Sequence, residues 1–268
     1  MTPPTRADIR AGLKGLAGLS PAVQAILPRL GDENLSAHEL GHMVSQDPIL
    51  AARVLHLANS PFYGLPRQVG SLEEAVLILG ISHLRGMVLS TGLIGLFSDA
   101  EAIARSLATA AAAGSLAKSL KRDQGMAFTA GLLHNLGALL LGHFAPDVWR
   151  SLASELTLEG ENRLSLEKAA FGFDHCELGA DIAGDWHFPD AIRSTIRSHP
   201  QPPDDPVERL TDLVHVAWLI SSDTASGDRP TINPAILQRL GLDGPAGEAS
   251  LADASQAATD SKGTLAAL

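Results

Sequence analysis

The sequence predicts an all-α fold, and three observations support this expectation. Alanine and leucine, both strong helix formers, dominate the 268 residues, whereas aromatic residues, which favour strands, make up only 4% of the chain. Helix-start signals recur, as in Ser36 with Glu39 three positions later and in Asp47 followed by Pro48. Alternation of apolar and polar residues, which is typical of half-buried strands, never continues for more than a few positions.

The N-terminal part of the chain is expected to hold several short helices. Asn59, followed by Ser and Pro, is a helix-stop signal, and Gly80 interrupts another apolar segment. Cap residues and apolar spacing together predict helices at 22–30, 36–45, 49–58, 71–79 and from about 82.

The C-terminal part is expected to supply the core and then to end in a tail. Helices are predicted at 100–121, 128–144, 165–170, 176–186, 189–198, 210–220 and 234–240. The segment from Phe128 to Phe144 is the most apolar, so we expect it to form one helix at the centre of the core. Beyond Gly241 large apolar residues are few, which predicts a mobile tail from about 244 to 268.

Charge and cysteine content limit the classes of function. The net charge of −10 and the scattered Lys and Arg residues argue against nonspecific nucleic-acid binding, which needs a concentrated basic surface. Lys118, Lys121 and Arg122 form the only tight basic group, and a solvated helix end explains it. Cys176 is the single cysteine, so no internal disulfide can form and a reducing, cytoplasmic location is expected.

Two segments bear on the question of membrane targeting. The first ten residues are polar and contain no apolar run, so they do not resemble a signal peptide. The apolar stretch from Ala75 to Phe97 contains His83 and Arg85, and a membrane span would have to bury that arginine in hydrocarbon. We therefore expect buried helices there and no membrane association.

Most of the ten histidines are interpreted as surface residues or as core residues with satisfied hydrogen bonds. His38 and His42 lie four residues apart on one helix face, but two ligands do not make a metal site, so both are interpreted as structural. Cys176 directly follows His175, and adjacent helical residues point about 100° apart, so the cysteine is interpreted as a small buried hydrophobe.

His134 and Asn135 are the exception, because they interrupt an apolar segment with an imidazole and an amide. A buried imidazole needs a hydrogen-bond partner, and asparagine is not favoured in helix interiors. Two interpretations remain open at this point: the pair satisfies neighbouring helix ends, or it lines a polar pocket between helices.

The segment Ala-Gly-Leu-Leu-His134-Asn135-Leu-Gly resembles the paired His-Asp motif of HD phosphohydrolases, with asparagine in place of aspartate. The segments 173–179, 186–189 and 196–199 resemble the downstream part of that fold, and the segments 47–50, 54–60 and 75–80 resemble the HDOD family specifically. The resemblance covers about residues 20–220 and is specific because the motifs occur together in this order.

The resemblance implies a multi-helix HD-like bundle with an N-terminal helical half that is specific to HDOD proteins. The expected organisation is a lead-in at 1–19, an HDOD domain at 20–220 and a C-terminal extension at 221–268, with the domain divided into halves at 20–97 and 98–220. It also implies a bacterial signal-transduction module without catalytic activity, which acts through contacts with signalling proteins or as a homodimer.

The resemblance also identifies a vestigial metal pocket. HD enzymes bind metal with an early histidine, the His-Asp pair, a late aspartate and, in two-metal members, extra histidines. The corresponding residues here are Arg105, His134, Asn135, Trp218, and His175 with His199. Loss of both carboxylates removes the charge that holds a hard divalent cation, and an arginine repels one, so we expect no metal, no cofactor and no hydrolysis.

Two other functions were kept as alternatives. The pocket residues, with Arg105 as the phosphate contact, could bind a nucleotide or cyclic dinucleotide without cutting it. Alternatively, His134, His175 and His199 could retain a metal-dependent phosphohydrolase activity.

Overall fold

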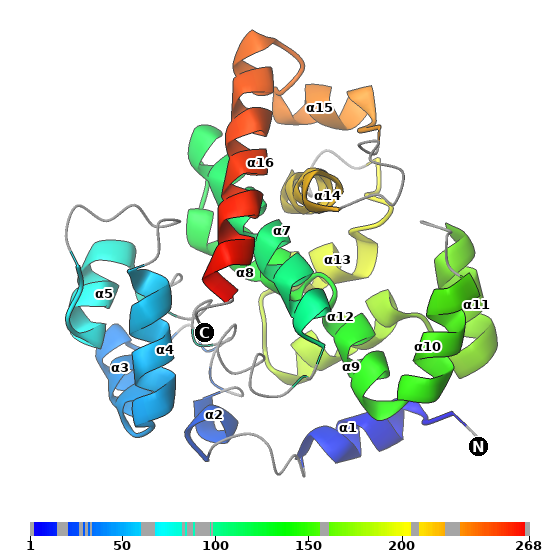
Figure 1. Ribbon diagram of the computed structural model, residues 1–268, viewed down its shortest axis with the longest axis horizontal. Coiled ribbons are helices and arrows are strands. Elements are labelled where there is room, and N and C mark those ends of the chain that lie inside the picture. Colours follow the sequence, from blue (N-terminus) through cyan, green and yellow to red (C-terminus); the bar gives the residue numbers. More distant parts are fainter. Residues whose placement is uncertain are drawn as a thin grey trace.

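The computed structural model describes residues 3–14, 21–26, 29, 32, 34–59, 68–81, 84, 88, 97, 99–155, 161–204, 209–222 and 231–265. All secondary-structure elements assigned in these residues are helices, which confirms the predicted all-α class (Figure 1). The helices are α1 (Arg6–Lys14), α2 (Pro21–Ile26), α3 (Ala37–Ser45), α4 (Pro48–Ala58), α5 (Leu72–Leu79), α7 (Ala100–Ser119), α8 (Gln124–Leu133), α9 (Leu136–Phe144), α10 (Pro146–Glu155), α11 (Glu161–Phe171), α12 (His175–Asp185), α13 (Asp190–Ser198), α14 (Arg209–Ser221), α15 (Pro234–Leu240) and α16 (Pro245–Leu265).

The N-terminal helices α2 to α5 pack against one another beside the larger bundle (Figure 1). Their ends follow the predicted caps: the Ser36 side chain accepts a hydrogen bond from the backbone N–H of Glu39, and the Glu39 side chain bonds back to Ser36. The Asn59 side chain links the end of α4 to the segment before α5. Its amide NH₂ donates to the Leu55 and Val69 carbonyls, and its amide oxygen accepts from the Val69 N–H. Most of the predicted helix from about 82 lies outside the described residues.

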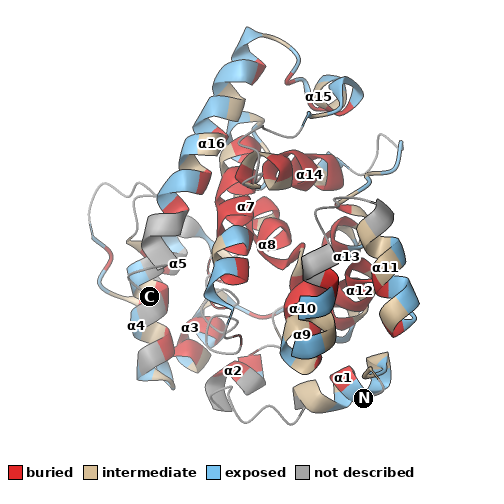
Figure 2. Ribbon diagram, turned by 45° about the vertical axis from the view of Figure 1, so that its right-hand side comes forward, coloured by how far each residue is buried: buried red, intermediate tan, exposed pale blue. Residues whose placement is uncertain are grey.

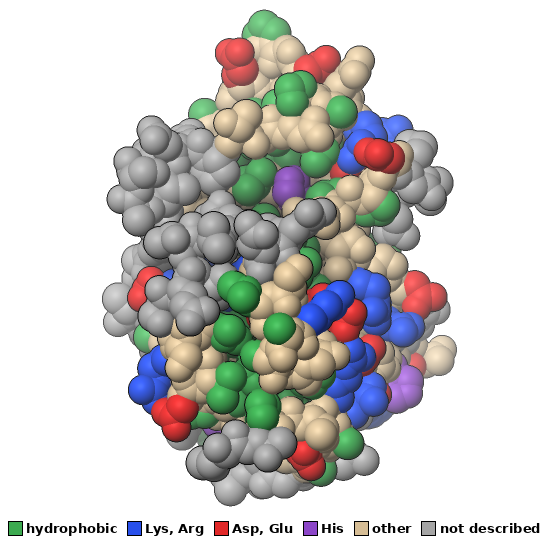
Figure 3. Space-filling model, turned by 90° about the vertical axis from the view of Figure 1, so that its right-hand side faces the viewer, with side chains coloured by type: hydrophobic (Ala, Val, Ile, Leu, Met, Phe, Trp, Pro, Cys, Tyr) green, Lys and Arg blue, Asp and Glu red, His purple; other side chains and the backbone are tan. Residues whose placement is uncertain are grey.

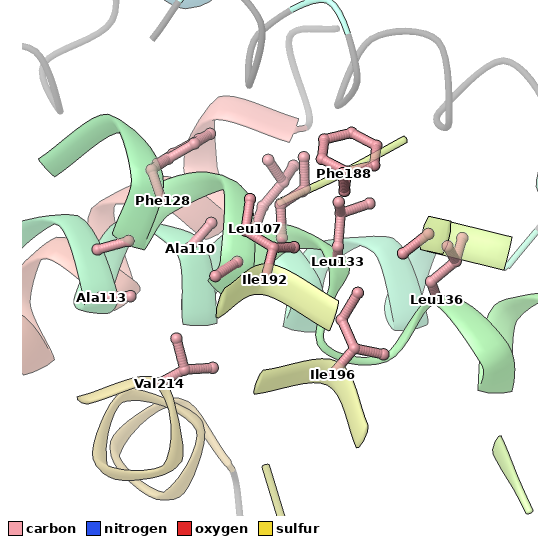
Figure 4. Close-up of a cluster of buried hydrophobic side chains, with 14 of the residues drawn as sticks. Leu107, Ala110, Ala113, Phe128, Leu133, Leu136, Phe188, Ile192, Ile196 and Val214 are labelled. Atoms are coloured by element: carbon pink, nitrogen blue, oxygen red, sulfur yellow. The ribbon is translucent and has the colours of Figure 1, made fainter. Parts of the chain in front are cut away.

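The larger bundle is built around α7 and α8, with α12, α13 and α14 packed nearby. Figure 2 shows that these helices hold most of the buried residues. Figure 4 shows one cluster in this core, to which α7 contributes Leu107 and α8 contributes Phe128 and Leu133. Ile196 and Val214 approach the same cluster from α13 and α14, so four helices that are not all consecutive in the chain share one apolar core.

The segment 128–144 was predicted to be one helix, and this prediction is wrong. The structure divides it into α8 and α9, because the chain turns at His134 and Asn135, where Asn135 has φ −106° and ψ 19°. The break places both polar residues at helix ends, where their side chains can reach a neighbouring space. Taken as one stretch, Gln124–Phe144 is apolar and long enough to cross a membrane, but 83% of its most apolar window is buried in the protein, as in the core helix of a soluble protein.

The predicted mobile tail from about 244 to 268 is also wrong over the residues that the structure describes. Residues 245–265 form α16, which packs along α7 and also contacts α14. Ala254 and Ala258 lie one turn apart, and both are buried. Their small side chains allow α16 to approach the alanine-rich α7 closely, so the helix is ordered without large apolar residues.

The N-terminal lead-in contains a helix that is fixed to the bundle. Arg6 of α1 forms ion pairs with Glu177 and Asp181 of α12, and its guanidinium lies 4.9 Å from the centre of the Phe173 ring. Ile9 of the same helix is fully buried. Sequence analysis gave no sign of this contact, because it joins residues about 170 positions apart.

Candidate functional site

All six residues predicted to form the vestigial pocket line one cavity of about 750 Å³. They are Arg105, His134, Asn135, His175, His199 and Trp218. They come from five different helices or helix ends, namely α7, the α8–α9 junction, α12, α13 and α14. Of the two interpretations of His134 and Asn135, the structure therefore supports a polar pocket between helices.

A close approach of two helix backbones brings the pocket residues together. A methyl group on Gly137 of α9 would lie only 1.9 Å from the backbone oxygen of His175 and 2.9 Å from the backbone nitrogen of Gly179. Only glycine fits at this crossing, and the crossing places the first turn of α12 next to the α8–α9 junction. The two motifs that carry the family resemblance therefore meet in space through their glycines.

Three histidine rings gather at one end of the cavity. The His199 ring is edge-on to the His134 ring at a centroid distance of 4.9 Å, and it lies 5.6 Å from the His175 ring. Nδ1 of His134 donates to the Gly131 carbonyl at 2.6 Å, and Nδ1 of His199 donates to the Ile196 carbonyl at 3.0 Å. In a neutral imidazole this leaves Nε2 without a proton, so both rings retain a hydrogen-bond acceptor or metal-ligand nitrogen.

Burial keeps the rings of His134 and His199 neutral. Loss of solvent lowers the pKa of His134 to about 4, because burial disfavours the charged form and outweighs the hydrogen bond to Gly131. The same cause lowers the pKa of His199 well below its usual value, with the neighbouring His134 and His175 acting in the same direction. At neutral pH these two residues therefore offer imidazoles rather than imidazolium cations.

Glu167 orients His175, and sequence analysis missed it. The carboxylate is fully buried and accepts two hydrogen bonds from His175, one from Nδ1 at 2.6 Å and one from the backbone N–H at 2.8 Å. Burial acts to raise the pKa of Glu167, but the hydrogen bonds from His175, together with the nearby Arg163 charge, outweigh it and lower that pKa overall. Arg163 adds an ion pair at 3.0 Å. Glu167 precedes His175 by eight positions, and the chain reverses between them at Gly172, where φ is +80°. No short-range sequence pattern reveals this contact.

Cys176 is buried, as predicted, but its side chain does not point away from the imidazoles of His175 and His199. Its Sγ lies 3.3 Å from Nε2 of His175 and 3.9 Å from Nδ1 of His199. His175 and Cys176 open α12, and their side chains meet although adjacent helical residues point about 100° apart. The cysteine thus belongs to the histidine cluster.

The other predicted residues form the cavity walls. The Trp218 ring meets the His199 ring edge-on at 5.5 Å, which fills the space beside that histidine. The Asn135 side chain makes no capping hydrogen bond for α9 although the residue occupies the N-cap position. Arg105, predicted to place a permanent cation at the metal position, is half-exposed and pairs with Glu101 at 2.6 Å. It lines the cavity wall with its guanidinium partly open to solvent.

Two more arginines and an indole extend the cavity toward the surface. Arg163 lies over the Trp149 ring at 5.1 Å, and Arg150 pairs with Asp147. Figure 3 shows basic and acidic side chains interleaved on the face of the molecule that carries α11. Among the described residues that line the cavity, Asp99 supplies the only carboxylate, and that carboxylate caps α7 by accepting the Ala102 N–H.

The donor set does not fit the hard divalent cations that HD hydrolases use. Such cations require carboxylate oxygens, and a two-metal centre also requires a carboxylate that bridges the ions. At the positions where the family resemblance implies carboxylates, the cavity wall has the amide of Asn135 and the indole of Trp218, and Asp99 is engaged in capping. The described residues offer imidazole nitrogens and a sulfur instead.

Residues 16–202 match the HDOD domain family, and because this is more than half of the chain, the chain belongs to that family. A protein of Treponema pallidum without an assigned function is 27% identical over 186 residues, which cover 66% of this chain and 36% of that protein. The chain thus spans about a third of the length of this curated relative. The predicted limits of the domain at 20 and 220, and its division at 97, stay predictions.

Solved structures of similar fold include proteins of three bacteria. A candidate phosphohydrolase from Shewanella amazonensis is 25% identical with a TM-score of 0.73, over 96% of this chain and 97% of that one. An HDOD domain protein of unknown function from Geobacter sulfurreducens is 23% identical with a TM-score of 0.72, over 96% and 95%. A candidate signal transduction protein from Marinobacter aquaeolei is 22% identical with a TM-score of 0.72, over 97% of this chain and 66% of that one. The last two likenesses establish the fold alone, and together these structures confirm the HD-like helical bundle.

Proposed function

We propose that this chain is a non-catalytic bacterial signalling module that acts in the cytoplasm through contacts with other signalling proteins. The observation that carries the proposal is the donor set of the cavity. It keeps the imidazoles of His134, His175 and His199 but has an amide at Asn135 and an indole at Trp218, where the family resemblance implies metal-binding carboxylates.

Membership of the HDOD family supports a role in signalling, and the name of the Marinobacter aquaeolei protein agrees with it. The name of the Shewanella amazonensis protein points instead to phosphate ester hydrolysis. The chemistry of this cavity favours the first role, since a neutral amide and a ring cannot hold or bridge two divalent ions.

The protein contacts are tested with the tagged full chain as bait in an extract of its own organism, followed by mass spectrometry. The proposal expects enrichment of the same signalling protein in replicate captures, and direct binding of that purified protein to the purified chain. If no captured protein binds the purified chain directly, the proposed mode of action is wrong.

A second candidate is a sensor that binds a phosphorylated nucleotide or a cyclic dinucleotide in the cavity. Its size of about 750 Å³ and the arginines in its wall, Arg105, Arg150 and Arg163, favour this candidate. A ligand at 100 times its dissociation constant would stabilise the fold by about 2.7 kcal/mol, which a thermal-shift screen detects. A shift that Arg105→Gln weakens supports the sensor, whereas no shift with any nucleotide at millimolar concentration rejects it.

A further inference from the structure

The histidine cluster contains a sulfur that the hard-metal chemistry of HD hydrolases does not use. Within the described residues, one ligand atom each from His175, Cys176 and His199 lies within 4.8 Å of the other two, and all three residues are buried. We propose that these three side chains bind a single borderline-soft ion, with Zn²⁺ as the natural occupant.

The distances suit such an ion. A tetrahedral zinc that is 2.3 Å from sulfur and about 2.05 Å from nitrogen holds those two ligand atoms about 3.6 Å apart. Here Sγ of Cys176 lies 3.3 Å from Nε2 of His175 and 3.9 Å from Nδ1 of His199. Shifts of a few tenths of an ångström would therefore bring both pairs to the required separation.

The surroundings of His175 resemble those of a metal-binding imidazole. A ligating histidine usually donates its other ring N–H to a carboxylate or carbonyl, which fixes the ring and makes the ligating nitrogen more basic. Nδ1 of His175 donates to the fully buried Glu167 at 2.6 Å, so Nε2 is left unprotonated and directed at the cysteine. This carboxylate also supplies negative charge next to a buried cation.

The donor set selects the class of metal. A thiolate and two imidazoles favour zinc over magnesium or calcium, which prefer oxygen ligands. Binding replaces the thiol proton of Cys176 with the metal and releases that proton to solvent. Coordination through Nδ1 of His199 also requires the proton that this nitrogen now donates to the Ile196 carbonyl to move to Nε2 of the same ring, and that hydrogen bond is lost.

Three protein ligands leave a fourth coordination position for water or for a ligand group. Because His175 and His199 both line the cavity, this position would open toward it. The inference is independent of the proposed signalling role, since it concerns only whether the ion binds.

The first experiment uses the wild-type protein, whose single cysteine makes any sulfur signal unambiguous. Metal-free protein is titrated with Co²⁺, a spectroscopic substitute for zinc, and then with Zn²⁺ against a chromogenic chelator. We expect one equivalent of each ion, a sulfur-to-cobalt charge-transfer band in the near ultraviolet, and protection of Cys176 from alkylation. Failure to bind an equivalent, or binding without the charge-transfer band, overturns the proposal.

Variants then test the individual ligands. We expect Cys176→Ser to weaken zinc binding by about 100-fold or more, and Glu167→Gln, which removes only the orienting carboxylate, to weaken it by about 10- to 100-fold. His38→Gln, which changes an exposed histidine outside the cluster, should leave the affinity unchanged. Equal zinc affinity in Cys176→Ser and wild type would also overturn the proposal, whatever the outcome of the signalling and hydrolysis assays.

Discussion

Gly137 offers the sharpest test of how the pocket is assembled. In Gly137→Ala the new methyl group would lie 1.9 Å from the oxygen and 2.7 Å from the carbon of the His175 carbonyl. Both atoms belong to the backbone, so no side-chain rotation can relieve the overlap. Ordinary contact between such atoms needs about 3.5 Å, so α9 and α12 would have to separate by roughly 1.5 Å.

Overpacking of a well-packed core costs about 1–3 kcal/mol when side chains can adjust, and we expect about 3 kcal/mol or more here because they cannot. At about 2–4 °C per kcal/mol this lowers the melting temperature by about 6–12 °C. The measurement is urea and thermal unfolding followed by circular dichroism. The variant should also move His175 relative to His134, since the clash lies at the His175 backbone.

Gly142→Ala is the matched control in the same helix. Its methyl group would meet only the Trp149 side chain, at 3.3 Å, and that ring can shift. We expect its free energy of unfolding to stay within about 1 kcal/mol of wild type, helped by the higher helix propensity of alanine. If Gly137→Ala and Gly142→Ala unfold at the same urea concentration, the proposed backbone crossing is wrong.

Three further predictions concern charge. Because folding lowers the pKa of His134 from 6.5 to about 4, the unfolded chain binds the proton first as the pH falls. The contribution of His134 to the free energy of unfolding is therefore complete above about pH 6.5 and decreases by about 3 kcal/mol by about pH 4. Urea unfolding at several pH values should find a smaller loss in His134→Gln. Arg6→Gln should lower the free energy of unfolding by less than about 1 kcal/mol, because the ion pairs of Arg6 are partly exposed. The same change should speed amide hydrogen exchange in α1. Unchanged exchange would mean that the pairs with Glu177 and Asp181 do not fix this helix. Asn135→Asp alone should not create tight Mn²⁺ binding by calorimetry, because Trp218 still replaces the second carboxylate, and a gain above about 10-fold would show that one carboxylate suffices.

Features set by neighbouring residues could be predicted from the sequence. The capping box of Ser36 and Glu39 and the helix start at Pro48 lie where the sequence predicts them, because each depends on contacts within four residues. The six cavity residues were predicted together because the family resemblance supplies long-range information that local pattern lacks. Their assignment as ligand-binding residues stays a prediction.

Features that depend on distant contacts could not be predicted. The role of Glu167 depends on the reversal at Gly172, and the order of α16 depends on the close approach of its alanines to α7. The helix break at Asn135 was missed although asparagine is disfavoured in helix interiors, because the apolar residues on both sides of it have the spacing of one continuous helix. In each case tertiary packing decides between local structures that the sequence alone leaves equivalent.

The central claim is that this cavity has lost phosphate ester hydrolysis along with its carboxylates. The most direct measurement is phosphate release from nucleoside phosphates, cyclic dinucleotides and a chromogenic phosphate ester, by wild-type protein supplied in turn with Mg²⁺, Mn²⁺, Fe²⁺ and Zn²⁺. The account predicts turnover no higher than that of His134→Ala under every condition. Metal-dependent turnover by the wild type that disappears in His134→Ala would contradict it.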